Sequence, residues 1–423
     1  MPPRRLNVPA GLLEPIEHEL SNGLRIRLLP DPSTPIVSYQ TFFRVGSRNE
    51  RPGLTGISHL FEHLMFNGAA KYGPKEFDRH LESRGGRSNA YTSWDVTAYH
   101  EEAPAEALPL LLDMEVDRMG ALRITEESLA SEREVVKEER RQSVDDSVMG
   151  VMDEQLQALI FQAHPYHWPI IGWPADLDRI KLPDCRAFFA SNYAPNNATV
   201  YVCGALEPKV ALRQMEAAYG ALPRGPVTSS PPTEEPPQRG ERRARVAHPV
   251  QAPMLAVAFR GPAAHDRTSA DLDAVQAVLG FGEGSLLARE LVHRLKLCTD
   301  VEVDYAWRLD AGTFAIWMQL PPGGKPERAE AALWTQLDRL SERGPDRAHL
   351  ERAKSQMEVA LIRELATSGG RAHAVGSGEA LLGSLAGVAG LFDRIHGVTV
   401  RSARDVAAKT FRREAICSVL AVP

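Results

Sequence analysis

Apolar and polar residues repeat with two different periods along this chain, and each period predicts one kind of element. Short runs rich in Val, Ile, Phe and Tyr predict strands, at 24–30, 35–47, 198–206, 253–261 and 312–321. Apolar residues that recur every three or four positions predict helices, at 54–67, 75–84, 104–120, 125–142, 208–219, 268–280, 284–296, 326–342, 346–365 and 402–411. Because strands and helices occur in both halves of the chain, an α+β fold is expected.

A proline-rich segment separates the two halves. Residues 221–243, ALPRGPVTSSPPTEEPPQRGERR, show no hydrophobic period and predict a solvated linker. The flanking segments, 1–220 and 244–423, are each near the usual size of a domain. The tripeptide Asp-Arg-Ile precedes a predicted helix and strand in both segments. This repetition favours two similar domains.

The composition and charge of the chain argue against several classes of binding partner. The chain has 423 residues, 43% hydrophobic and 25% charged, with a net charge of −6, which gives no reason to expect nucleic acid. No apolar run reaches the roughly 18 residues of a membrane span. The N-terminal stretch lacks a secretory apolar region, so we expect a cytoplasmic chain, or a periplasmic one if a signal peptide was removed. The four cysteines are scattered and predict free thiols.

The segment ISHLFEHLMF places three polar side chains in an otherwise apolar predicted helix. His59 and His63 are four residues apart, so their side chains share one face, about 5–6 Å apart at Cβ. Two imidazoles at this separation can bind one Zn²⁺. Glu62 projects beside the pair, where it can reach a water molecule. The alternative is a pair of histidines at the core edge, held by ordinary hydrogen bonds, and a third ligand is needed to decide.

The predicted helix 125–142 offers that third ligand. In SEREVVKEERR, Glu132 and Glu139 are seven residues apart and project from nearly the same side, whereas Glu138 does not. Charged residues at this density also suit a helix that simply faces solvent. The segment therefore gives candidates but no decision by itself.

These motifs together resemble the M16 family of zinc metallopeptidases, the inverzincins. In that family H-x-x-E-H is followed much later in the chain by a glutamate ligand, which Glu139 matches, with Glu138 as the alternative if the register shifts by one. Three further segments are similar to family segments: residues 85–104, GGRSNAYTSWDVTAYHEEAP; residues 164–180, HPYHWPIIGWPADLDRI; and residues 188–206, FFASNYAPNNATVYVCGAL. The resemblance covers most of the chain.

The resemblance implies a fold and a catalytic site. Each domain would be a mostly antiparallel sheet packed against helices, and the two would form half of a clam-shaped chamber. One zinc ion per chain would be bound by His59, His63 and Glu139, with Glu62 moving the proton during peptide hydrolysis. Glu132 would hold a ligand histidine through its other ring nitrogen.

The same resemblance implies a substrate site on the predicted strand RSNAYTSWDVTAYH. Asn89, Ala90, Tyr91 and Thr92 would bind a peptide by β-augmentation, which reads main chain more than side chain. Ordinary strand packing is the alternative role for Tyr91. The substrates expected are peptides or unfolded segments of proteins.

One family feature is absent from the second domain. Complete enzymes have an arginine and, seven residues later, a tyrosine, but His293 and Asp300 occupy those positions here. Arg289, Arg294 and Tyr305 lie nearby with the wrong spacing. We therefore expect a heterodimer with a homologous subunit that carries the Arg/Tyr pair. A homodimer, or a non-catalytic M16-like subunit that binds peptide or a partner, is the alternative.

The remaining polar motifs predict no second site. His80, His100, His164 and His167 lack ligand spacing to one another, so structural roles are expected. The glycine-rich segment 376–390 has no P-loop lysine, which argues against nucleotide binding. In the family this region forms a loop and a helix.

Overall fold

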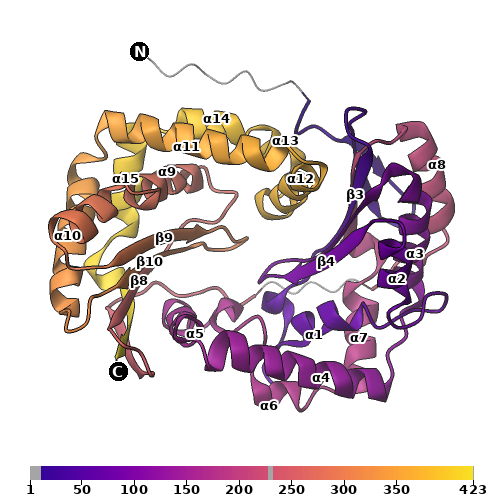
Figure 1. Ribbon diagram of the computed structural model, residues 1–423, viewed down its shortest axis with the longest axis horizontal. Helices are drawn as coiled ribbons and strands as arrows, with labels where there is room; N and C mark the ends of the chain where they lie inside the picture. Colours follow the sequence, from indigo (N-terminus) through magenta and orange to yellow (C-terminus); the bar gives the residue numbers. More distant parts are fainter. Residues whose placement is uncertain (1–10, 227–231, 423) are drawn as a thin grey trace.

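The computed structural model describes residues 11–226 and 232–422, which form two halves side by side, each with its own sheet (Figure 1). The first sheet contains β1 (Ile16–Glu19), β2 (Arg25–Pro30), β3 (Ile36–Phe43), β4 (Arg87–Thr92), β5 (Thr97–Pro104) and β6 (Ala198–Gly204). The second contains β7 (Arg242–Ala247), β8 (Met254–Arg260), β9 (Asp300–Ala306), β10 (Thr313–Gln319) and β11 (Cys417–Val422).

The two sheets have matching topology. The strand order is β1-β2-β6-β3-β5-β4 in the first and β7-β11-β8-β10-β9 in the second. Each sheet has one parallel pair, β2 with β6 and β7 with β11, and its other pairs are antiparallel. The α+β prediction with two similar, mostly antiparallel units is confirmed. The strands β4 and β9 each lie at one edge of their sheet.

Fifteen α-helices are described around these sheets. In the first half they are α1 (Ile57–Leu64), α2 (Glu76–Glu82), α3 (Leu108–Ala121), α4 (Glu126–Arg140), α5 (Val148–Ile160), α6 (Pro174–Leu177), α7 (Leu182–Asn192) and α8 (Pro208–Tyr219). In the second half they are α9 (Thr268–Gly280), α10 (Pro326–Arg343), α11 (Arg347–Leu365), α12 (Ser368–Leu382), α13 (Leu385–Ala389), α14 (Leu391–Gly397) and α15 (Val400–Thr410). The predicted helix 284–296 is instead the π-helical segment η6 (Ala288–Arg294).

Short helical turns complete the description. They are η1 (Ser47–Asn49), η2 (Ala105–Ala107), η3 (Arg141–Asp145), η4 (Pro165–His167), η5 (Pro195–Asn197) and η7 (Arg413–Ala415). Among the described helices, none is both long enough and apolar enough to cross a membrane.

Each half contributes one helix to the sheet of the other half. The first-half helix α5 packs on β7, β8 and β11, where Met152, Leu156 and Ile160 are buried against the second sheet. The second-half helix α12 packs on β3 and β6 of the first sheet, and Figure 1 shows it between the two halves. Burial of apolar side chains on both exchanged helices stabilises the junction. The halves therefore share cores across their boundary.

The segment predicted as the single strand RSNAYTSWDVTAYH is a hairpin. Its two strands, β4 and β5, pair antiparallel and are joined by a turn that begins at Ser93. The Ser93 hydroxyl accepts hydrogen bonds from the N–H groups of Asp95 and Val96, at 3.2 and 3.0 Å. Serine side chains favour such turns by bonding to nearby backbone groups, a local signal that the alternating pattern concealed.

The glycine-rich segment 376–390 is mostly helical, lying in α12 and α13, with Gly383 in the left-handed region at φ 76° between them. A Cβ on Gly376 would meet the Phe42 ring at 2.5 Å. Glycine therefore permits α12 to approach the first sheet closely, although glycine lowers helix propensity.

The predicted linker 221–243 is partly fixed to the protein. Residues 227–231 lie outside the described residues. Beyond them, the Glu235 carboxylate accepts hydrogen bonds from the N–H groups of Gln162, Ala163 and His164, at 2.8–3.0 Å. Gln238 is buried and donates to the Ile416 carbonyl. Within residues 232–243 the predicted solvated linker is therefore held in part against the fold, because Glu235 and Gln238 form hydrogen bonds with backbone groups of other segments.

Candidate metal centre

The helix α1 orients the two histidines that the sequence pairs. Ile57, Leu60, Phe61 and Leu64 are buried in the core of the first half, which fixes the rotation of the helix. His59 and His63 consequently share another face, and their ring centroids are 5.0 Å apart. His59 is buried and His63 is half-buried.

The start of α1 is held by Glu50, a residue that the sequence patterns did not identify. Its carboxylate accepts hydrogen bonds from the N–H groups of Gly56 and Ser58, both at 2.8 Å. These donors are otherwise unpaired at a helix N-terminus. Burial raises the pKa of Glu50 to about 8. Because Glu50 lies outside the helix, no capping motif adjacent to α1 indicated its role.

The helix α4 brings two carboxylates against the histidines. It begins at a capping box between Thr125 and Ser128. The Glu139 oxygens lie 3.5 Å from His59 Nε2 and 3.3 Å from His63 Nε2, and Glu132 Oε2 lies 3.4 Å from His63 Nδ1.

The alternative ligand Glu138 points elsewhere. It accepts a hydrogen bond from Gln142 at 2.9 Å and pairs with Arg141. The structure therefore brings Glu139, and not Glu138, to the histidine pair. The separation of these neighbours follows from the roughly 100° rotation between consecutive helical residues.

His59, His63 and Glu139 form a group that fits a divalent metal ion. One ligand atom from each residue lies within 4.8 Å of the others, and among the described residues this is the one such group of three or more His, Cys, Asp or Glu side chains. Two imidazole nitrogens and a carboxylate oxygen match the donors that zinc takes at catalytic sites. The residues present therefore fit the ion.

The carboxylates around the two histidines give this group an excess of negative charge. Burial lowers the pKa of His59 to about 4. Burial would also lower the pKa of His63, but the carboxylates of Glu132 and Glu139 outweigh it and raise that pKa to about 9. Hydrogen bonding to His63 lowers the pKa of both glutamates. The two carboxylates thus stay ionised around the imidazoles, an arrangement that favours a bound cation.

Glu62 lies on the side of the group that faces β4. The Thr92 hydroxyl donates a hydrogen bond to Glu62 Oε2 at 2.7 Å. Burial raises the pKa of Glu62, against the effects of the Thr92 hydrogen bond and the His63 charge. A half-buried carboxylate held in this way is suited to exchanging a proton.

The four predicted substrate residues lie on the edge strand β4 but differ in surroundings. Asn89 is exposed, and Ala90 and Thr92 are half-buried. The Tyr91 ring packs edge-on against Phe42 and 5.6 Å from the His373 ring of α12. Packing of Tyr91 is therefore observed directly, while within residues 11–226 and 232–422 no strand pairs with the outer side of β4.

A cavity of about 300 Å³ adjoins the group. His59, Thr92, Trp94 and Glu139 line one part, and α5 lines another with Asp153, Glu154 and Gln157. The cavity thus joins the histidine–glutamate group to β4 and to the helix that crosses to the second half.

The second half contacts two residues that line this cavity, Trp94 and Gln157, through Arg308. Its guanidinium lies 3.6 Å from the centre of the Trp94 ring and donates a hydrogen bond to Gln157 Oε1 at 3.0 Å. Arg308 is only 2% exposed, and burial lowers its pKa to about 10. Neighbouring Asp95 accepts a hydrogen bond from the Leu309 N–H. No local pattern predicted this contact, because Trp94 and Arg308 are more than two hundred positions apart.

The other histidines remain outside the group. His164 contacts Asp310 at 2.9 Å, and His167 contacts the His164 carbonyl. The His80 ring lies against Tyr72, and burial lowers the pKa of His100. These surroundings are structural, as the spacing suggested.

The residues considered for the Arg/Tyr pair have other partners. Arg289 contacts His349, Arg294 pairs with Glu290, and Tyr305 donates to the Pro262 carbonyl at 2.7 Å. His293 pairs with Glu283.

Comparisons with known proteins identify the family of the chain. Residues 25–172 match the family model described as insulinase, peptidase family M16, and residues 179–357 match the one described as peptidase M16 inactive domain. The chain is 30% identical over 354 residues to the zinc protease PqqE of Helicobacter pylori, covering 82% of this chain and 80% of that protein. It is 24% identical over 400 residues to a probable mitochondrial-processing peptidase subunit beta of Arabidopsis thaliana, covering 92% and 75%.

The fold is also similar to a solved structure. The crystal structure of a protease from Helicobacter pylori superposes with a TM-score of 0.92 at 28% identity, covering 96% of this chain and 99% of that one. Together, the two matched models, the 30% identical relative and this superposition show that the chain belongs to the M16 peptidase family.

Proposed function

We propose that this chain is a zinc-dependent endopeptidase that cleaves peptides or unfolded segments as the catalytic subunit of a two-chain assembly. The observation that carries the proposal is the convergence of His59 Nε2 and His63 Nε2 on the Glu139 carboxylate, beside Glu62. The zinc protease named among the relatives supports the choice of metal and of reaction.

Different residues of the chain bind the metal ion and transfer the proton. His59, His63 and Glu139 would hold the zinc ion, because two imidazoles and one carboxylate are the donors that zinc takes at catalytic sites. Zinc, when bound, supplies Lewis acidity that polarises a carbonyl and lowers the pKa of a water molecule. Glu62 takes a proton from the attacking water and delivers it to the leaving amine.

Two neighbours position these groups. Glu132 contacts His63 Nδ1 at 3.4 Å, which orients the ring so that Nε2 faces Glu139. The Thr92 hydroxyl holds one oxygen of Glu62 and leaves the other for the proton transfer. Thr92 therefore links the substrate strand to the proton-transfer group.

The edge strand β4 binds the substrate in this proposal. No strand of the described residues pairs with its outer side, and an extended peptide can add there through main-chain hydrogen bonds. Asn89, Ala90 and Thr92 contribute main chain, of which Thr92 lies at the cavity, whereas Tyr91 mainly supports the strand through its packing on Phe42. Recognition of main chain favours broad sequence specificity.

A partner subunit completes the substrate site in the same proposal. No arginine and tyrosine with the family spacing occur after the glycine-rich stretch at 280–284, and nearby Arg289, Arg294 and Tyr305 have other contacts. One relative is itself named as a subunit. A homologous chain that supplies the pair explains both observations.

Glu62→Gln tests the catalytic role with little change of shape. We expect one zinc per chain in the purified variant and no cleavage of a fluorogenic peptide library, because glutamine cannot accept the proton. Glu134→Gln is the matched control, since Glu134 is exposed on α4 and pairs with Lys137; it should retain activity. Full activity in Glu62→Gln would refute the assignment.

The assembly requires a separate measurement. Peptidase activity and molecular mass are measured for the chain alone and after co-expression with an M16-like chain that carries the Arg/Tyr pair. We expect weak activity alone and strong activity in a heterodimer. Strong activity from the homogeneous chain would contradict the two-chain proposal, and inactivity in every assembly would favour a non-catalytic subunit.

A further inference from the structure

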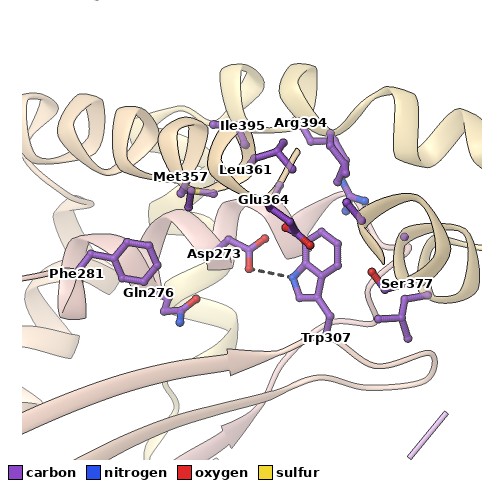
Figure 2. Close-up of a pocket in the computed structure, with 16 residues that line it drawn as sticks. Asp273, Gln276, Phe281, Trp307, Met357, Leu361, Glu364, Ser377, Arg394 and Ile395 are labelled. Atoms are coloured by element: carbon purple, nitrogen blue, oxygen red, sulfur yellow. Dashed lines mark hydrogen bonds between the residues drawn. The ribbon is translucent and has the colours of Figure 1, made fainter. Parts of the chain in front are cut away.

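A second cavity lies within the second half, away from the histidine–glutamate group. It measures about 280 Å³ and is enclosed by α9, α11, α12 and α14, with the Trp307 indole on one side (Figure 2). Its wall is mainly apolar and includes Phe281, Met357 and Leu361. The size is near the lower end of the range for small-molecule sites.

The helix α12 separates this cavity from the sheet of the first half. The α12 residues that line the cavity follow the helical spacing i, i+3, i+4, i+7: Ala374, Ser377, Gly378 and Leu381. Its other side packs on the first sheet, where Glu379 accepts hydrogen bonds from Arg27 and Tyr201. An occupant of the cavity would therefore contact the helix that joins the halves.

Two carboxylates line this apolar space with unused acceptor oxygens. Asp273 Oδ1 accepts a hydrogen bond from Trp307 Nε1 at 2.9 Å, drawn as a dashed line in Figure 2. Among the described residues, no donor contacts Asp273 Oδ2, and the Glu364 carboxylate has no hydrogen-bond or ion-pair partner. Burial raises the pKa of both groups, to about 7 for Asp273. Asp273 is half-buried, and Glu364 is exposed overall but loses part of its hydration to burial, so each carboxylate keeps acceptor capacity for a ligand.

The one basic residue of the lining is already engaged. Arg394 Nη2 donates to the carbonyls of Ala264 and Asp266, at 3.0 and 2.7 Å, and to Ser269 Oγ. Its guanidinium forms no ion pair with Asp273 or Glu364 among the described contacts. The cavity therefore has acceptors in excess of donors.

We propose that this cavity binds an amphipathic ammonium, a primary amine carried by a compact apolar group. The ammonium donates to Asp273 Oδ2 and Glu364, while the hydrocarbon part lies against Met357, Leu361 and the Trp307 ring. Charge-assisted hydrogen bonds in an apolar site are stronger than those between neutral groups.

Other ligand classes fit the cavity less well. A carboxylate or phosphate would meet two groups of like charge, and a neutral hydrocarbon would leave both carboxylates unpaired. A metal ion would need more ligands, and in residues 11–226 and 232–422 the one cluster with enough ligands is that of His59, His63 and Glu139.

An ammonium carried by an apolar group occurs both in free amines and in the lysine side chain of a peptide. The rim of the cavity lies near β4, because the Tyr91 ring is 5.6 Å from the ring of His373, which directly precedes the lining residue Ala374. The experiment therefore includes both sources.

Titration calorimetry with the purified protein at pH 7.5 tests the proposal with three probes of similar shape. These are 2-phenylethylamine, 2-phenylethanol and 3-phenylpropionate. We expect a dissociation constant of about 1 mM for the amine, which is reasonable for a ligand of this size. The alcohol and the acid should bind at least about tenfold more weakly. Equal binding of amine and alcohol, or no amine binding, would overturn the proposal.

Three variants locate the binding. Glu364→Gln and Asp273→Asn each remove one charge and should weaken amine binding about three- to tenfold, without affecting the alcohol. Ala374→Leu fills the cavity and should abolish amine binding. Glu364 is exposed, so its variant will fold and decides the question if Ala374→Leu does not fold. Unchanged amine affinity in Glu364→Gln and Asp273→Asn would refute the site.

A competition experiment with peptides distinguishes a free amine from a lysine side chain as the ligand. An N-acetylated peptide with one lysine is compared with its norleucine counterpart, each in competition with 2-phenylethylamine. Competition by the lysine peptide alone identifies a substrate side chain as the occupant, whereas absence of competition identifies free amines. This binding measurement is independent of peptidase activity, so its result does not depend on the proposed function.

Discussion

The two halves share the topology of five strands, with β1 as an addition in the first sheet, but carry different chemistry beside the edge strands β4 and β9. In the first half, α1 packs near β4 and presents His59 and His63 to the carboxylates of α4. In the second half, η6 packs near β9 and presents His293 and Arg294 to solvent. The comparison teaches that this fold supplies a frame and that a few side chains decide whether it holds a metal site.

The difference also depends on the helix opposite each segment. Glu132 and Glu139 of α4 point at α1, whereas the helix that contacts η6, α10, uses Asp338 and Glu330 to pair with arginines. Without converging carboxylates the second half has no counterpart of the first-half group among the described residues.

The largest difference between the two halves is expected when one histidine is removed from each of them. His63→Ala should lose bound zinc and lower peptide cleavage at least about a thousandfold, because the metal supplies several kcal/mol of transition-state stabilisation. His293→Ala is the matched variant in the second half and should keep both properties. Zinc content and initial rates measure the contrast. Equal zinc loss in the two variants would contradict the assignment.

The contribution of the second half to the first is tested at Arg308. Arg308→Ala removes a buried side chain stacked on Trp94 and should lower the free energy of unfolding by about 2–5 kcal/mol. Arg294→Ala removes an exposed ion pair and should change it by less than about 1 kcal/mol. Urea denaturation gives both values. A wild-type midpoint for Arg308→Ala would show that the halves are joined without this contact.

Two variants of α4 test which of its carboxylates support zinc binding. Glu132→Gln should weaken zinc binding about 10- to 100-fold, because Glu132 supports a ligand histidine without being a ligand. Glu138→Gln, on another side of α4, should leave zinc affinity unchanged. Competition with a chelator measures the two affinities. A larger effect from Glu138→Gln would mean that the register of α4 is wrong.

The smallest change in stability is expected from a substitution that affects the start of α1. Glu50→Ala removes the acceptor for two backbone N–H groups and should cost about 0.5–2 kcal/mol of stability, as for other lost caps. Glu283→Ala, an exposed residue before η6, should change stability by less than about 0.5 kcal/mol. Both are measured by chemical denaturation. Matching losses would show that the cap adds nothing specific to α1.

Much of the metal group follows from local periodicity. The four-residue spacing of the histidines and the seven-residue spacing of Glu132 and Glu139 survive in the structure because helices fix which residues share a face. The apolar stripe of α1 likewise predicts which side of the helix is buried. Contacts between remote segments, such as Glu50 with α1 and Arg308 with Trp94, have no period and could not be predicted.

The sequence by itself therefore determined the α+β class, most of the element positions and the pairing of His59 with His63, since these depend on short-range spacing and burial. The choice of Glu139 as the candidate third ligand came from the resemblance to the M16 family. Only the tertiary structure decided the exchange of α5 and α12, the hairpin at Ser93 and the helical state of the glycine-rich segment. The physical reason is that close packing between segments far apart in the chain selects among conformations that local propensity leaves nearly equal in free energy.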